Sequence, residues 1–149
     1  MRRDYFTLEA AGVQTDDSGR PTVRITYEGP TEELESRLRR GGTPLDGDGV
    51  DITYRLQNAL DADNPKGVFA IADRVTGEYV LELNADAETV FSVIETVADG
   101  DEKNGHYRLV IETDDGSELA VYEKSTLLVY DHGGDLLRER SLIPSGVEI

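Results

Sequence analysis

The chain has 149 residues, no cysteine and a formal charge of −16, which comes from 31 acidic and 15 basic residues. The absence of cysteine excludes disulfide frameworks, thiolate zinc sites and cysteine nucleophiles. This length suits one domain, so we expect residues 1–149 to form a single globular domain. Regular apolar alternation in many segments distinguishes the chain from an acidic disordered one.

The basic residues are almost all arginine, since lysine occurs only at positions 66, 103 and 124. An acidic, lysine-poor surface indicates adaptation to a salt-rich cytoplasm, because molar salt shortens the Debye length to about 3 Å and screens self-repulsion. No stretch approaches the ~20 apolar residues of a membrane span, and no signal peptide follows Arg2-Arg3. We therefore expect a cytoplasmic protein with no membrane partner.

Segments in which apolar and polar residues alternate predict the strands. In chain order, the expected strands cover residues 4–10, 22–28, 50–56, 67–73, 78–83, 106–113, 118–123 and 125–131, with one more over 135–143. The segment 67–73 is apolar on both faces and should be a central strand.

Two helices are expected between these strands. The first begins at Pro30, because proline favours the first helical position, and Arg37, Arg39 and Arg40 should lie in its last turn, where cations are favourable. The second covers residues 87–98, in which apolar residues recur at the i, i+3, i+4 and i+7 positions of a helix.

This order of elements predicts an α+β fold. Turn signals such as Asp115-Gly116 join consecutive strands into hairpins. We therefore expect a two-layer architecture, with a mainly antiparallel sheet and the two helices packed on one of its faces.

The segment that most resembles a functional site is Asp131-His132-Gly133-Gly134-Asp135. A histidine between two carboxylates suits proton transfer or metal binding, so His132, Asp131 and Asp135 are the candidate catalytic residues. The alternative is a hairpin tip, because Gly-Gly suits a two-residue type I′ turn with positive φ at both positions. We favour the turn, since it accounts for all five residues without a ligand.

Asp46 and Asp48 are the candidate metal ligands, because they occupy positions 1 and 3 of a calcium-loop pattern. The pattern then fails, since Asp51 stands where a calcium loop needs glycine and Gln57 where it needs glutamate. An acidic, solvated loop is the simpler explanation. The chain also lacks the glycine motifs that bind phosphates or dinucleotides, so we expect neither a metal nor a cofactor.

Clustered arginines are the best argument for nucleic acid. Arg37, Arg39 and Arg40 form one cluster, and Arg138 and Arg140 form another. They would need to lie on one face to bind a phosphate backbone, and the gain from counterion release shrinks as salt rises. We therefore do not expect nucleic acid as a partner.

Missing catalytic signatures favour a non-enzymatic binding or protein-interaction module, with a partner protein or a second copy of the chain as its ligand. Strand edges and the segment 143–149, which ends in apolar residues, are the expected contact points. Two alternatives remain open. One is a small enzyme that uses carboxylates with His106 or His132, and the other is a nucleic-acid-associated protein that uses the arginine clusters.

The opening MRRDYFTLEA, together with the acidic, arginine-over-lysine composition, resembles an uncharacterised haloarchaeal protein family, a domain of unknown function. The resemblance implies a halophilic archaeal source. It implies no activity and no catalytic or binding residues.

Overall fold

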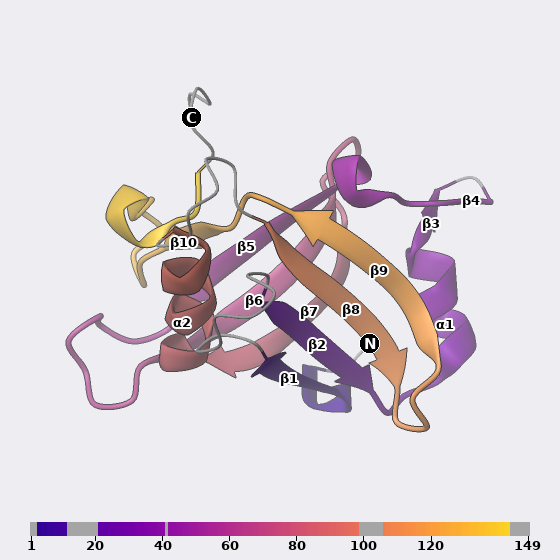
Figure 1. Ribbon diagram of the computed structural model, residues 1–149, viewed down its shortest axis with the longest axis horizontal. Coiled ribbons are helices and arrows are strands. Elements are labelled where there is room, and N and C mark those ends of the chain that lie inside the picture. Colours follow the sequence, from indigo (N-terminus) through magenta and orange to yellow (C-terminus); the bar gives the residue numbers. More distant parts are fainter. Residues whose placement is uncertain (1–2, 12–20, 41, 99–105, 144–149) are drawn as a thin grey trace.

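The computed structural model describes residues 3–11, 21–40, 42–98 and 106–143 (Figure 1). Its first sheet has the strand order β1-β2-β8-β9. These strands are β1 (Phe6–Ala11), β2 (Thr22–Tyr27), β8 (Tyr107–Thr113) and β9 (Glu118–Lys124). The second sheet has the order β10-β5-β6-β7. Its strands are β10 (Leu128–Tyr130), β5 (Val50–Leu56), β6 (Lys66–Asp73) and β7 (Tyr79–Asp86).

Helices and short elements connect these strands. The helices are α1 (Thr31–Arg37) and α2 (Ala87–Ala98), and a two-stranded ribbon pairs β3 (Arg39–Arg40) with β4 (Thr43–Pro44). The 3-10 turns are η1 (Arg3–Tyr5), η2 (Gly47–Gly49) and η3 (Arg138–Arg140). The predicted α+β class is thereby confirmed.

The strand pairs are mainly antiparallel, as predicted, but each sheet also contains one parallel pair. The β2–β8 and β5–β10 pairs are parallel, and the remaining pairs within the two sheets are antiparallel. Each parallel pair joins strands that are far apart in the sequence, and alternation within a strand carries no information about such pairings. The sequence therefore predicted the local hairpins and missed the long-range parallel neighbours.

One hydrophobic core lies between the two sheets. β2 buries Val23, Ile25 and Tyr27 on its inner face, and β5 buries every second residue from Val50 to Leu56. Residues from both sheets and both helices belong to the same buried cluster. Because the side-chain period of a strand is two, the residues between these buried positions face outward.

The two helices lie at opposite ends of the molecule in Figure 1, although both contact β7. α2 buries an apolar face that consists of Ala87, Val90, Val93, Ile94 and Val97. It contacts β1 and β7, which are edge strands of different sheets and also contact each other. α2 therefore packs where the edges of the two sheets meet.

The first helix is shorter than its arginines suggested. Pro30 is its N-cap, and the helix ends at Arg37 with Leu38 as C-cap. Arg39 belongs to β3, because the chain turns back to pair with β4 instead of completing another helical turn.

The strand predicted over residues 135–143 is wrong. Only isolated bridges form there, between Tyr130 and Leu136 and between Leu127 and Leu142, and η3 lies between them. The Ser141 hydroxyl donates to the Leu137 carbonyl at 2.7 Å and accepts a hydrogen bond from the Val129 amide at 2.8 Å. This side chain holds the segment in a compact turn beside β10.

Candidate functional site

A groove of about 370 Å³ lies on the outer face of the second sheet. Thr53 and Arg55 of β5 face outward there, and the register places them opposite Ala70 and Val68 of β6. The groove forms because the middle strand carries short side chains while its neighbours carry longer ones. Its lining consists of Thr53, Arg55, Leu56, Gln57, Val68, Ala70, Tyr79, Glu82 and His132.

The two ends of the groove carry different chemistry. Tyr79 pairs with Ala72 next to an irregularity in the β6–β7 register, and its side chain is 56% exposed. Arg55 pairs with Val68, several residues farther along β6, and His132 reaches this end from the loop after β10. An exposed aromatic ring therefore lies at one end, and a guanidinium and an imidazole lie at the other.

The Asp131–Asp135 loop is a hairpin tip, but not the predicted two-residue turn. The Asp131 amide donates to the Asp135 carbonyl, and the Gly134 amide donates to the Asp131 carbonyl. Gly134 has a φ of +91°, whereas Gly133 is not among the described residues with positive φ. This is a three-residue loop that ends in a left-handed glycine.

The Asp131 side chain explains why the loop takes this form. Its Oδ1 atom accepts hydrogen bonds from the Gly133 and Asp135 amides, each at 2.9 Å. Aspartate is favoured at the first position of such turns because its carboxylate can bind the amides that follow it. Asp131 is thus occupied in shaping the turn, while His132 lines the groove.

Arg55 links the turn to the sheet. Its Nη2 atom donates to the His132 carbonyl at 3.4 Å, which is a long hydrogen bond. A side chain at Gly134 would begin 3.8 Å from the same nitrogen, so the glycine backbone lies against the guanidinium. Arg55 and Tyr79 were not singled out in the sequence as site residues. An arginine on the polar face of the strand Val50–Leu56 was the available signal for the first of them.

Lys124 occupies the loop in which a metal was considered. Its side chain is buried, with 6% of the residue exposed, and Nζ donates to the carbonyls of Gly47 at 2.7 Å and Val50 at 2.8 Å. These oxygens are of the kind that calcium loops use as ligands. The loop therefore surrounds an ammonium that the protein supplies itself.

Burial lowers the pKa of Lys124, and the nearby Arg74 charge adds to this effect. The carboxylates of Asp51, Asp48 and Asp46 oppose it. The described part of the chain contains no group of three or more histidine, aspartate or glutamate side chains placed to hold a metal ion. In the structure, Asp46 and Asp48 thus compensate a buried lysine.

The arginines considered for nucleic-acid binding are dispersed. Figure 1 shows α1, with Arg37, at the opposite end of the molecule from the yellow C-terminal segment that carries Arg138 and Arg140. Arg39 lies in β3 next to α1, and the side chain of Arg40 lies outside what the structure describes. The arginine clusters therefore do not form one surface.

His106 is the other histidine that the enzyme alternative uses. It is half-buried just before β8, and its Nδ1 atom is buried without a hydrogen-bond partner among the described residues. No described carboxylate is hydrogen-bonded to it, so the contacts of this side chain identify no partner for proton transfer.

Most strand edges, the other predicted contact points, are covered. The C-terminal segment lies along β10 through the bridges at Leu136 and Leu142. On β9, the register shifts at Leu119, and a side chain at Gly47 of η2 would begin 3.2 Å from the Glu123 carbonyl oxygen. Bulges and covering loops are the usual protection of sheet edges. The tail 144–149 lies outside the described residues.

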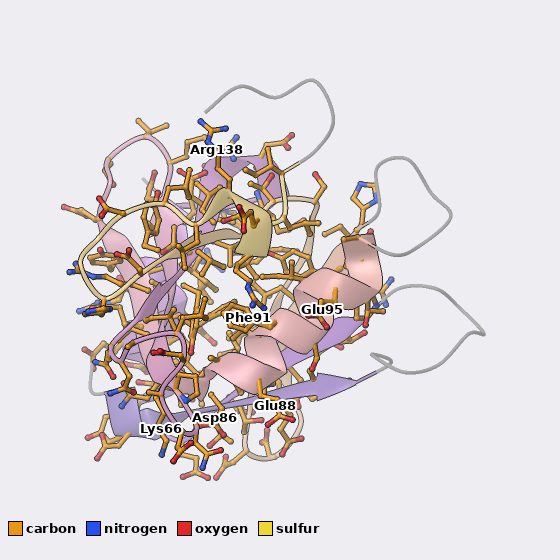
Figure 2. The ribbon with its side chains drawn as sticks, turned by 90° about the vertical axis from the view of Figure 1, so that its left-hand side faces the viewer. Lys66, Asp86, Glu88, Phe91, Glu95 and Arg138 are labelled. Carbon is orange, nitrogen blue, oxygen red and sulfur yellow. The ribbon has the colours of Figure 1, made fainter. Side chains whose placement is uncertain are left out.

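Other hollows offer less chemistry. One of about 290 Å³ is lined by Asn64, Pro65, Lys66, Asp86 and Glu88. Figure 2 shows Lys66, Asp86 and Glu88 close together at the start of α2, far from Arg138. Lys66, the one cationic side chain in this lining, therefore lies beside carboxylates. A second hollow, of about 380 Å³, lies between the α1–β4 region and β9 and includes the protected β9 edge.

A family model described as "Family of unknown function (DUF5793)" matches residues 1–149. The chain belongs to this family. Neither the search of curated proteins nor that of solved structures found a match. Within the described residues, no helix has the length and apolar character to cross a membrane.

Proposed function

We propose that this member of the family is a non-enzymatic binding module that takes a partner protein on the outer face of its second sheet. The observation that carries the proposal is the groove framed by Tyr79 and Arg55. Tyrosine and arginine are enriched among the residues that contribute most to binding energy at protein interfaces. A concave surface with an exposed aromatic ring and a guanidinium is therefore well suited to a protein ligand.

Covered edges favour the sheet face over β-strand addition as the mode of binding. Partners that add a strand need a row of free backbone groups, and β9 offers little of one between Leu119 and Gly47. The groove, in contrast, presents side chains of three strands and one loop. Side-chain recognition on a sheet face is the mode that this arrangement supports.

Contacts within the Asp131–Asp135 loop favour binding over proton transfer. The Oδ1 atom of Asp131 accepts two backbone hydrogen bonds, and no described hydrogen bond joins His132 to either carboxylate. Catalytic histidines are commonly oriented by a carboxylate within hydrogen-bond reach. For the same reason we interpret His132 as part of the groove wall.

The composition supports a salt-rich cytoplasm as the working environment, as expected for a haloarchaeal protein. A formal charge of −16 on 149 residues repels itself strongly in dilute buffer. At molar salt, with a Debye length of about 3 Å, close contacts dominate over long-range attraction. A partner would then be held by packing and hydrogen bonds, which the groove can supply.

Comparative affinity capture tests the proposal. The immobilised protein would be incubated with a lysate of the source cells in molar KCl, alongside the variants Tyr79→Ser and Val121→Ser. Val121 is a matched control, because it is an exposed apolar residue (45%) on the first sheet. We expect a protein that wild type and Val121→Ser retain and Tyr79→Ser loses. Retention by Tyr79→Ser, or no specific protein on wild type, would refute the proposal.

A further inference from the structure

We infer that the groove on the second sheet recognises a carboxylate, delivered by an acidic side chain of the bound segment to the Arg55 guanidinium. This inference rests on the proposed function, because it names the chemistry that the partner must bring. It starts from the hydrogen bonds that Arg55 makes and from those that it leaves available.

Arg55 differs from the other outward-facing arginines of the two sheets and their turns. Arg24 pairs with Glu112 at 2.9 Å, Arg74 with Asp51 at 2.8 Å, and Arg108 with Glu123 at 3.2 Å. Each of these guanidinium groups forms an ion pair with a carboxylate, as expected in a chain with 31 acidic and 15 basic residues.

Within the described residues, the only hydrogen bond of Arg55 is the long one to the His132 carbonyl. A guanidinium carries five N–H donors, so most of the hydrogen-bonding capacity of Arg55 faces the groove or solvent. In this acidic chain, an arginine without a carboxylate partner is an unused anion-binding group.

The turn fixes where this group lies. The backbone of Gly134 lies against the guanidinium, and the His132 carbonyl accepts from Nη2. A guanidinium held at one edge can present its remaining donors to a carboxylate in the two-pronged geometry that such pairs favour. The Asp131–Asp135 loop thus positions Arg55 for a ligand.

Charge in the groove favours a carboxylate over a phosphate. Glu82 also lines the groove, from β7, which is separated from β5 by β6. Recognition of phosphorylated segments commonly uses clusters of arginines, and Arg55 is the only arginine of the lining. A single guanidinium suits a singly charged group such as a carboxylate. The segment should therefore carry its acid near Arg55.

Peptide titration followed by NMR tests this inference. The probes are the capped tripeptides acetyl-Ala-Glu-Ala-amide and acetyl-Ala-Gln-Ala-amide, which differ in one charge. Each is titrated into the full-length protein in the same KCl buffer, and a third titration uses inorganic phosphate. We expect the glutamate peptide to shift the Arg55 side-chain resonance and the amides of residues 132–135 at lower concentration than the glutamine peptide.

The variant Arg55→Gln should weaken binding of the glutamate peptide by about two- to fivefold, which is the range expected for a solvent-exposed ion pair. Arg108→Gln is the matched control, since it removes the same charge from an arginine that is already paired. Its affinity for the peptide should be unchanged. Thermal melts of both variants verify that they remain folded.

Equal shifts for the two peptides, or glutamate binding that survives Arg55→Gln, would overturn the inference. Tighter binding of phosphate than of the glutamate peptide would also overturn it, in favour of a phosphate site. These outcomes leave the proposed function intact if wild type captures a protein that Tyr79→Ser does not retain. Conversely, if Tyr79→Ser retains the same protein as wild type, the proposed function is refuted even if Arg55 binds the glutamate peptide.

Discussion

Lys124 Nζ donates a hydrogen bond of 2.7 Å to the Gly47 carbonyl and thereby ties the end of β9 to η2, the turn that precedes β5. A second bond, to the Val50 carbonyl, completes the connection between the two sheets at this point. An acidic loop that resembled a fragment of a calcium site is therefore organised by a lysine from a distant strand.

Replacing Lys124 by methionine should destabilise the fold by about 3 kcal/mol, because the Val50 and Gly47 carbonyls lose a charged donor in one buried and one partly buried hydrogen bond. Chemical unfolding of the two proteins in the same KCl buffer measures the difference. Lys66→Met is the control, since Lys66 is exposed, and it should change stability by no more than about 0.5 kcal/mol. Equal stability of Lys124→Met and wild type would contradict the role assigned to the ammonium.

The glycine pair of the Asp131–Asp135 loop offers a second test, because its two members differ. Gly134→Ala should cost about 1–2 kcal/mol, since alanine is strained at a φ of +91°. Gly133→Ala should be tolerated, because its added carbon would meet only Asp131 Oδ1 at 3.4 Å. Similar unfolding free energies for the two variants would argue against the three-residue loop.

This loop also shows what sequence reasoning could and could not provide. Gly-Gly between apolar strands predicted a hairpin tip correctly, because the turn chemistry is local. The turn type was wrong, since the Asp131 carboxylate binds two following amides and decides the backbone geometry. That His132 lies beside Arg55 depends on the parallel β5–β10 pair, which no local pattern encodes.

In the rest of the fold, too, local patterns were predictable from the sequence and contacts between distant segments were not. The alternation of β5 and the helical period of α2 identified their buried faces, because each face repeats at the period of its own element. Lys124 could not be assigned to the core from sequence, since lysines are almost never fully buried unless paired. Its partners, Gly47 and Val50, are more than seventy residues away.

Alkaline pH should unfold the protein cooperatively. Burial raises the pKa of Tyr107, Tyr54 and Tyr27, and it raises that of Tyr122 to about 12. The unfolded value is about 10, so these groups stabilise the fold fully below pH 10 and lose that contribution as pH rises toward their folded values. Each contributes a slope of at most about 1.4 kcal/mol per pH unit.

The lowered pKa of Lys124 has the opposite effect on stability. The free energy of unfolding rises with pH until the unfolded lysine also loses its proton near pH 10.4. Above that value the tyrosines act alone. Urea unfolding at several pH values between about 9 and 12 should show a decline that begins near 10. The free energy of unfolding of Tyr54→Phe should decline less steeply with pH, because one fewer tyrosine loses its proton on unfolding. Stability that stays constant over this range would contradict the burial of these hydroxyls.

Stability should rise steeply with KCl, because salt screens the repulsion among 31 acidic side chains. The thermal midpoint is measured from dilute buffer to molar KCl. The double variant Glu32→Gln, Glu35→Gln removes two exposed charges of α1 and should reduce the salt dependence. A midpoint that does not change with salt would refute the interpretation of the acidic surface.

The most direct test of the account is the dissociation constant of the captured partner, measured by titration calorimetry in molar KCl. Tyr79→Ser should raise the constant by about tenfold or more, because exposed tyrosines that a partner buries often contribute most to binding energy, whereas Val121→Ser should leave it unchanged. A partner that binds wild type and Tyr79→Ser with the same affinity would show that the outer face of the second sheet is not the binding surface.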